Sequence, residues 1–238
     1  MIKVITFDLW NTLFVNKSYF DERFMFFSYF LEKKKITISS NVIKNAFDLS
    51  FYLPERNYEK NSHIYTEDRI SKMLNILKIN LVKEEEKEIR DRFEEEMLCD
   101  PPLLKTGVKN TLQELCSDYK IGLISNTGIT PGRVISKVFQ KYDIARFFQV
   151  KIFSDEIGFY KPHPILFKTV LDRFDCTPQS IVHVGDKLET DIKGAKDCGI
   201  FAIWFNEFHS PQSDNFNPDY EIHKISEVPN IIKSLHNF

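Results

Sequence analysis

Cysteine is scarce in this chain of 238 residues, and the few cysteines present form no pattern. The four of them make no CxxC pair and no Cys/His spacing that suits zinc. A disulfide framework and a zinc module are therefore excluded as the basis of the fold. We expect four reduced, buried thiols in a protein of the cytoplasm.

Long apolar runs and an excess of one charge are also absent. No stretch approaches the roughly 20 apolar residues of a membrane span, and a strand-like segment begins almost at the first residue, so we expect neither a membrane anchor nor a signal peptide. The formal net charge is only −2, from interspersed acidic and basic residues. This balance predicts no nucleic-acid partner and no membrane partner. Monomer and homodimer both remain open.

An apolar run at the start of the chain, residues 4–7, predicts a buried strand, and an aspartate follows it directly. Asp8 is thereby placed at the carboxyl end of a strand, the edge at which open α/β sheets bind their ligands. This position suits a nucleophile. It also suits an aspartate that merely caps the turn after a strand.

Between residues 18 and 98 the apolar pattern is helical, and it predicts four amphipathic helices that pack as a small bundle. The expected helices begin near Ser18, near Ser39 or Ser40, near Thr66 and near Lys83. Residues 19–30 hold seven aromatic side chains, more than one helix face buries. Core packing, an apolar pocket and a dimer surface are the alternatives for them.

Asp100-Pro101-Pro102 ends the helical pattern, and strands then alternate with helices to the end of the chain. We predict helices at 107–116, 131–141, 163–174, 190–198 and 226–236, and strands at 120–125, 149–153, 180–184 and 200–205. This alternation predicts an α/β fold with a doubly wound, mainly parallel sheet. The chain would then comprise an α/β domain, residues 1–16 and 100–238, and a helical insertion, residues 17–99.

Three further segments place polar residues after predicted strands or in the loop before a helix. They are Ser125-Asn126-Thr127, Lys161 in Gly158-Phe159-Tyr160-Lys161-Pro162, and Gly185-Asp186 followed by Asp191. Together with the segment around Asp8, they resemble the four sequence motifs of the haloacid dehalogenase-like hydrolase superfamily. The insertion resembles the helical cap of one large branch of that superfamily. The resemblance covers essentially the whole chain and implies a Rossmann-like core with a four-helix-bundle cap.

The resemblance assigns chemical roles to individual residues. Asp8 would be the nucleophile, which forms an acyl phosphate during phosphate-ester hydrolysis. Mg²⁺ would be held by Asp8, by the backbone carbonyl of Trp10 and by Asp186, because a hard cation prefers oxygen ligands. Asp191 would orient the metal-bound waters or the lysine, although an aspartate that simply favours a helix start fits the same position.

The same resemblance implies a phosphate-binding set made of Ser125, Asn126, Thr12 and Lys161. The hydroxyl of Ser125 and the amide of Asn126 can donate hydrogen bonds to phosphoryl oxygens. Lys161 would also be catalytic, since its ammonium neutralises the carboxylates and the transferred phosphoryl group. The implied cofactor is Mg²⁺, and the implied substrate is a small phosphorylated metabolite.

One feature departs from the resemblance. Phosphatases of the superfamily usually have a second aspartate two residues after the first, which protonates the leaving alcohol, and here Trp10 stands at that position. An indole N–H is no acid at ordinary pH, so three explanations compete: a slow or specialised phosphatase, a 2-haloacid dehalogenase, and a non-catalytic protein that binds a phosphorylated ligand or a protein partner. Dehalogenases also have an aromatic residue there, but Asp186 argues against that interpretation.

Overall fold

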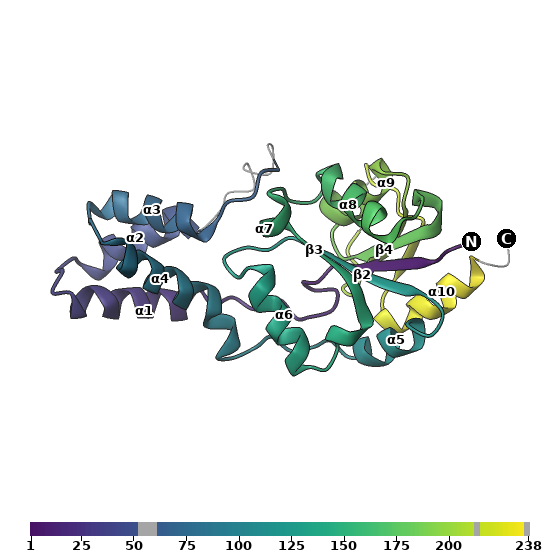
Figure 1. Ribbon diagram of the computed structural model, residues 1–238, viewed down its shortest axis with the longest axis horizontal. Coiled ribbons are helices and arrows are strands. Elements are labelled where there is room, and N and C mark those ends of the chain that lie inside the picture. Colours follow the sequence, from purple (N-terminus) through teal and green to yellow (C-terminus); the bar gives the residue numbers. More distant parts are fainter. Residues whose placement is uncertain (52–60, 212–214, 236–238) are drawn as a thin grey trace.

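The structure is a computed structural model that describes residues 1–51, 61–211 and 215–235. These residues form an α/β part and, beside it, a group of four helices (Figure 1). The predicted α/β fold with a parallel, doubly wound sheet is confirmed. Within the described ranges, no helix is long and apolar enough to cross a membrane.

The described residues form a sheet of six strands in the order β3-β2-β1-β4-β5-β6, and every pairing is parallel. The strands are β1 Val4–Phe7, β2 Lys120–Ser125, β3 Phe148–Phe153, β4 Ile181–Gly185, β5 Phe201–Phe205 and β6 Tyr220–Ile222. The strand order reverses between β1 and β4. In doubly wound sheets, this reversal opens a crevice at the carboxyl ends of the two strands.

Helices cover both faces of the sheet (Figure 1). One hydrophobic cluster joins the sheet to α5, α6 and α10, and a second joins its other face to α8 and α9. The helices are α5 Val108–Leu115, α6 Gly132–Lys141, α7 Ser154–Ile157, α8 Pro164–Phe174, α9 Lys193–Asp197 and α10 Val228–Ser234. This burial on both faces explains why the central strands are apolar runs rather than alternating patterns.

Most predicted elements of the α/β part match the structure to within two residues. The helix expected at 190–198 begins earlier, as a π-helical turn at Leu188–Ile192 that leads into α9. The short elements α7 and β6 were not predicted, since three or four residues are too few to show a period. The end of the helix expected at 226–236 falls outside the described residues.

The four remaining helices are α1 Phe20–Lys33, α2 Ser40–Phe51, α3 Thr66–Leu77 and α4 Lys83–Glu95, followed by a 3₁₀ turn at Glu96–Leu98. We call α1–α4 the helical unit. It has a hydrophobic cluster of its own, in which the Phe47 ring packs edge-on against Phe20 and Phe24. Most aromatic side chains of α1 belong to this cluster, which favours core packing as their role.

Two neighbouring segments join the helical unit to the sheet. The Val15 N–H donates to the Leu103 carbonyl at 2.9 Å, and the Lys105 N–H donates to the Leu13 carbonyl at 2.9 Å. Both connections therefore leave the α/β part at one place.

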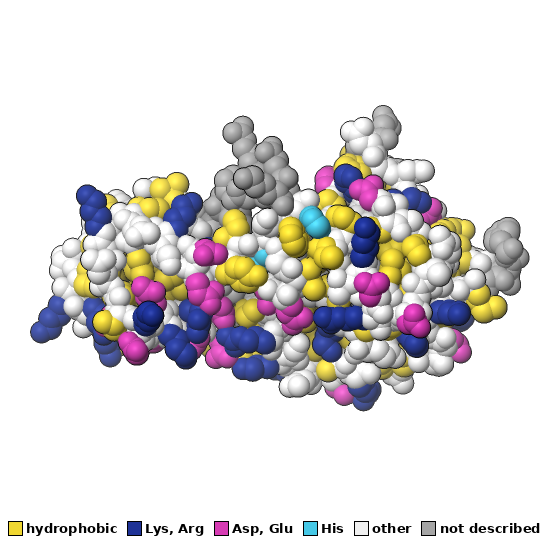
Figure 2. Space-filling model, turned by 45° about the horizontal axis from the view of Figure 1, so that its top comes forward, with side chains coloured by type: hydrophobic (Ala, Val, Ile, Leu, Met, Phe, Trp, Pro, Cys, Tyr) yellow, Lys and Arg dark blue, Asp and Glu magenta, His cyan; other side chains and the backbone are white. Residues whose placement is uncertain are grey.

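The surface and the thiols allow two further comparisons with the sequence. Acidic and basic side chains are interleaved on the face shown in Figure 2, as the balanced charge predicts. The four cysteines are unpaired, but the prediction that they are buried was wrong: Cys99 is exposed and the other three are half-buried.

Candidate active site

A cavity of about 340 Å³ lies between the carboxyl edge of the sheet and the helical unit. The wall residues from the α/β part are Asp8, Trp10, Asn126, Thr127, Lys161, Asp186, Lys187, Thr190 and Asp191. The wall residues from α1, its N-terminal flank and α3 are Tyr19, Arg23 and Arg69, and the 3₁₀ turn after α4 adds Met97. Five of the predicted site residues thus meet at one cavity with Trp10. The cavity size suits a small ligand.

Asp8 is fixed at the end of β1 from three directions. Its N–H donates to the Val184 carbonyl of β4 at 2.8 Å, so the sheet hydrogen bonding continues through it. The Lys161 Nζ donates to Oδ1 at 2.5 Å, and the Thr12 hydroxyl donates to Oδ2 at 3.3 Å. Burial raises the pKa of Asp8 to about 6, and Lys161 only partly offsets this effect. The carboxylate is therefore oriented, yet its charge is not fully balanced.

Lys161 is 1% exposed, and its ammonium group has three acceptors. It donates to Asp8 Oδ1 at 2.5 Å, to Asp191 Oδ1 at 2.6 Å and to the Ile124 carbonyl at 2.7 Å. Burial acts to lower the pKa of Lys161, but Asp191 and Asp8 outweigh it and raise the pKa above its ordinary value. Lys161 is thus a permanent cation between two carboxylates.

Asp191 is buried beside β4, and both of its oxygens are already occupied. Oδ1 accepts from Lys161 and from His183 Nε2 at 3.1 Å, and Oδ2 accepts from the Lys187 N–H at 3.1 Å. Burial opposes its charge, but Lys161 and His183 hold the pKa of Asp191 well below its ordinary value. Gly185 permits this approach, because a Cβ there would lie 2.4 Å from the Asp191 Cγ.

His183 is a residue of this network that the sequence did not single out. It is fully buried in β4, and burial lowers its pKa, so the ring is neutral. Since a carboxylate only accepts, Nε2 donates to Asp191, and Nδ1 lies 3.0 Å from the Thr6 hydroxyl. A histidine inside the apolar strand Ile181–Gly185 was the available signal, because a buried polar side chain needs a partner.

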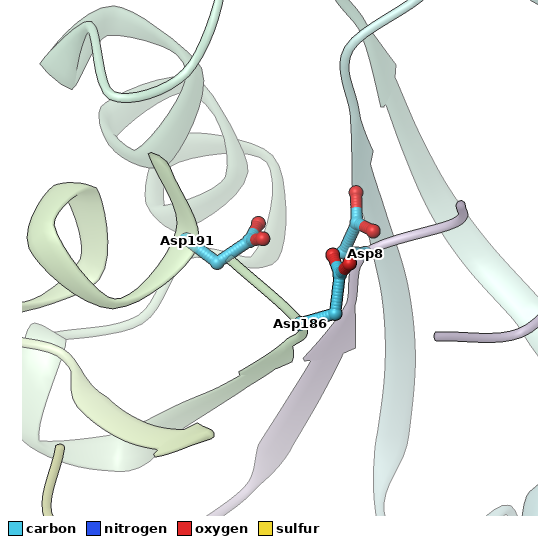
Figure 3. Close-up of side chains that lie close together, drawn as sticks. All are labelled: Asp8, Asp186 and Asp191. Carbon is cyan, nitrogen blue, oxygen red and sulfur yellow. The ribbon is translucent and has the colours of Figure 1, made fainter. Parts of the chain in front are cut away.

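Asp186 completes a group of three carboxylates. Ligand oxygens of Asp8, Asp186 and Asp191 lie within 4.8 Å of one another, and Figure 3 shows the Asp8 and Asp186 carboxylates side by side at the ends of β1 and β4. Burial, and then the charges of Asp8 and Asp191, raise the pKa of Asp186 to about 8. Three carboxylates so close together, two of them buried, need more positive charge than Lys161 alone provides. Their oxygen atoms are the ligands that a hard divalent cation prefers. All three aspartates offer a carboxylate oxygen to one cation. Asp191 already accepts three hydrogen bonds and has the least capacity left, so Asp8 and Asp186 are the side chains that we expect to contact a metal.

The predicted phosphate-binding residues lie close to Lys161, but in different surroundings from those expected. The Lys161 N–H donates to Asn126 Oδ1 at 2.7 Å, and Asn126 Nδ2 donates to the Lys161 carbonyl at 3.2 Å. Asn126 therefore holds the backbone that presents the lysine. Ser125 and Thr12 are fully buried behind the cavity wall; Ser125 Oγ donates to the Asn126 carbonyl at 3.4 Å.

Trp10 is the residue where an acid was expected. It is half-buried, packs against the main hydrophobic cluster and lines the cavity two residues after Asp8. Asn11, the next residue, has a positive φ of 58°, and its N–H donates to the Phe14 carbonyl at 2.7 Å. A tight turn thus presents the indole to the site.

Comparison with known proteins found a matching family profile and several related proteins. The sequence profile described as haloacid dehalogenase-like hydrolase matches residues 2–199. A glyceraldehyde 3-phosphate phosphatase from Pyrococcus furiosus is 32% identical over 130 residues, 54% of this chain and 53% of that protein. A phosphoserine phosphatase from Thermus thermophilus is 32% identical over 85 residues, 36% of this chain and 34% of that protein. The chain therefore spans about half or less of the length of these relatives.

Solved structures share the fold over nearly the whole chain. A 2-haloacid dehalogenase from Pseudomonas syringae pv. Tomato has a TM-score of 0.76 and 23% identity, covering 99% of this chain and 100% of that one. A HAD phosphatase from Thermococcus onnurineus has a TM-score of 0.61 and 21% identity, covering 97% of this chain and 98% of that one. At these identities, the likeness concerns the fold alone.

Proposed function

Because the chain belongs to the haloacid dehalogenase-like hydrolase family, we propose that it is a Mg²⁺-dependent phosphatase of a small phosphorylated metabolite in the cytoplasm. The observation that carries the proposal is the meeting of Asp8, Lys161 and Asp186 at one cavity. They come from three distant segments of the chain. The phosphatase names of the relatives support the same reaction class.

The two parts of the structure have different roles in the proposed function. Residues 1–16 and 100–238 form the α/β domain that holds the reacting groups, and residues 17–99 form a cap over the cavity. The separate hydrophobic cluster of α1–α4 and the two adjacent connections support this division. A cap so joined is suited to open for the substrate and to close over it.

The proposed reaction has two displacements at phosphorus. An oxygen of Asp8 forms a bond to phosphorus while the ester P–O bond breaks, and the electron pair leaves on the alcohol oxygen, which takes a proton from solvent water. Water then attacks the acyl phosphate, which releases inorganic phosphate and returns the Asp8 carboxylate. Lys161 and Thr12 orient this carboxylate for both steps.

The cluster of carboxylates is the reason to propose a metal ion in this reaction. Asp8, Asp186 and the Trp10 carbonyl would hold Mg²⁺, with Asp191 fixing Lys161 from behind. Bound Mg²⁺ would supply positive charge to the phosphoryl oxygens, which makes attack by an anionic carboxylate feasible.

Metal binding predicts a pH-dependent stabilisation. The pKa values of about 6 for Asp8 and about 8 for Asp186 exceed the ordinary value of 3.8, so the metal-free folded state binds extra protons at intermediate pH. Its free energy of unfolding should therefore fall as the pH rises from about 4, and this fall should end near pH 6 for Asp8 and near pH 8 for Asp186. Mg²⁺ at 100 times its Kd should restore about 2.7 kcal/mol at pH 8.5, and less at pH 5.5.

Thermal and urea unfolding with chelator and with Mg²⁺ measures this effect. Asp186→Asn should reduce both the pH dependence and the Mg²⁺ effect, whereas Asp172→Asn on the exposed face of α8 should change neither. A wild-type protein whose unfolding ignores Mg²⁺ at pH 8.5 would refute the metal site.

Trp10 predicts an unusual dependence on the leaving group. Without an acid beside Asp8, aryl and acyl phosphates should be hydrolysed far faster than alkyl phosphates, because only a poor leaving group needs a proton. Trp10→Asp should raise alkyl phosphate turnover by about 10-fold or more, while Trp10→Phe, which adds no acid, should give no gain. Steady-state rates over a series of leaving-group pKa values test this, once chemistry is shown to limit turnover.

Two other functions remain as outcomes of that assay. If native protein and Trp10→Asp are inert on every ester but a phosphorylated ligand binds, the protein is a non-catalytic binding member of the family. Full activity on a 2-haloacid in excess chelator would instead indicate a dehalogenase, the function that an aromatic residue at position 10 also suits.

A further inference from the structure

A buried arginine of the helical unit faces the cavity without a carboxylate partner. Arg23 of α1 is 5% exposed and lines the cavity wall. Its Nε donates to the Phe93 carbonyl at 2.8 Å, and its Nη2 donates to the Thr130 hydroxyl at 3.0 Å, so both acceptors are neutral. Glu96, the carboxylate that acts on it most strongly, is paired with Arg92 at 2.5 Å.

The charge of Arg23 is therefore poorly compensated. In the part of the chain that the structure describes, Arg23 takes part in no ion pair. Burial lowers its pKa to about 10, despite the partial help of Glu96. Burying a charged group without a counter-charge costs free energy, so the burial of the Arg23 guanidinium at the cavity wall has to be explained. An anion from a ligand in the cavity would supply the missing partner.

A second arginine reinforces this polarity. Arg69 of α3 is 2% exposed, lines the same cavity and donates to the Phe51 carbonyl at 3.1 Å. Its charge acts on Arg23 and opposes the Arg23 charge. The acidic residues of the cavity wall all lie on the opposite, sheet side, at Asp8, Asp186 and Asp191. The cavity thus has a sheet side built for the reacting phosphoryl group and a cationic side beyond it.

We infer that Arg23, with Arg69 beside it, binds a second anionic group of the substrate. The substrate class is then a small phosphate monoester that also has a carboxylate or a second phosphate away from the ester bond. Both groups match the fork of N–H donors that a guanidinium presents. The inference rests on the proposed function, because Asp8 and Lys161 define where the reacting phosphate lies.

A purely structural role for Arg23 makes a different prediction. Its bond to Thr130 ties α1 to the loop after β2, and its bond to Phe93 ties α1 to α4. If Arg23 only held the cap in place, its loss would weaken the binding of every ligand by the same factor. If Arg23 binds a second anionic group, its loss should instead weaken the binding only of ligands that have such a group.

The experiment measures equilibrium binding by calorimetry in the Asp8→Asn background, in which the ligands are not turned over. The probes with a second anionic group are 2-phosphoglycolate, 3-phosphoglycerate and 1,3-propanediol bisphosphate, and the reference is glycerol 3-phosphate, whose phosphate is its only anionic group. At least one of the probes should bind about 10- to 100-fold more tightly than the reference, as a charge-assisted hydrogen-bonded pair implies. Carboxylate and phosphate are distinguished by which probe binds best.

Arg23→Met should remove that preference, with a 10- to 100-fold weaker Kd for the preferred probe and a change of about twofold or less for glycerol 3-phosphate. Arg23→Lys should keep part of the preference. Arg90→Met, on α4 and away from this cavity, should leave both Kd values unchanged. If Arg23→Met fails to fold, Thr130→Val removes the tie to the loop and should leave the preference intact.

Three results would overturn the inference: equal losses for ligands with and without the second anionic group, loss of preference in Thr130→Val, or no preference in the parent protein. Its failure is separable from that of the proposed function. Ester hydrolysis without anion preference would refute the second-anion site alone, and preference without hydrolysis of any ester would refute the phosphatase alone.

Discussion

Replacement of Asp8 by asparagine is expected to lower phosphatase turnover by a factor on the order of 10⁴ or more, because the amide is no nucleophile and no acyl phosphate can form. The fold should survive the change. Asparagine has nearly the same volume, and Lys161 keeps its bonds to Asp191 and to the Ile124 carbonyl. Initial rates on an aryl phosphate in Mg²⁺ measure the loss.

The exposed Asp172→Asn serves as the matched control and should keep full activity. Circular dichroism and thermal unfolding establish that both variants are folded. Turnover by Asp8→Asn within about tenfold of the native rate would contradict the nucleophile assignment.

Replacement of Lys161 by methionine is expected to remove activity and also to destabilise the protein by about 3–5 kcal/mol. The substitution leaves the buried carboxylates of Asp8 and Asp191 facing each other without the cation that lies 2.5 and 2.6 Å from them. The loss of stability should be smaller at pH 5 than at pH 8, since a carboxyl that takes up a proton no longer needs a counter-charge.

Urea unfolding at the two pH values gives the free energy of unfolding. Lys168→Met, at an exposed position of α8, should change it by less than about 0.5 kcal/mol. A Lys161→Met protein as stable as the native one would show that the ammonium group does not balance the buried carboxylates.

The sequence predicted the sheet and its functional edge well, for a physical reason. Strands buried on both faces are mostly apolar, so β1, β2 and β4 are visible as short runs, and a polar residue at the end of each run marks the carboxyl end of the strand. Asp8 and Asp186 follow β1 and β4 directly. Because these strands are neighbours and parallel, the two carboxylates meet.

What the sequence did not predict depends on contacts between distant segments. Asn126 turns toward the backbone of Lys161, 35 residues away, and His183 finds Asp191 across a turn. Nothing in the sequence pattern distinguishes Arg23 and Arg69 from other charged residues of amphipathic helices. They become cavity residues only because the helical unit packs over the carboxyl edge of the sheet.

The most direct test of the account is to look for the phosphoryl group on Asp8 during turnover. The native protein is mixed with an aryl phosphate and Mg²⁺, quenched in acid within the first turnover, digested and analysed by peptide mass spectrometry. The account predicts a phosphorylated peptide that contains residues 4–12, with the acyl phosphate on Asp8, and none in Asp8→Asn or in excess chelator. Release of inorganic phosphate with no phosphorylated Asp8 at any time, or with the phosphoryl group on another residue, would contradict it.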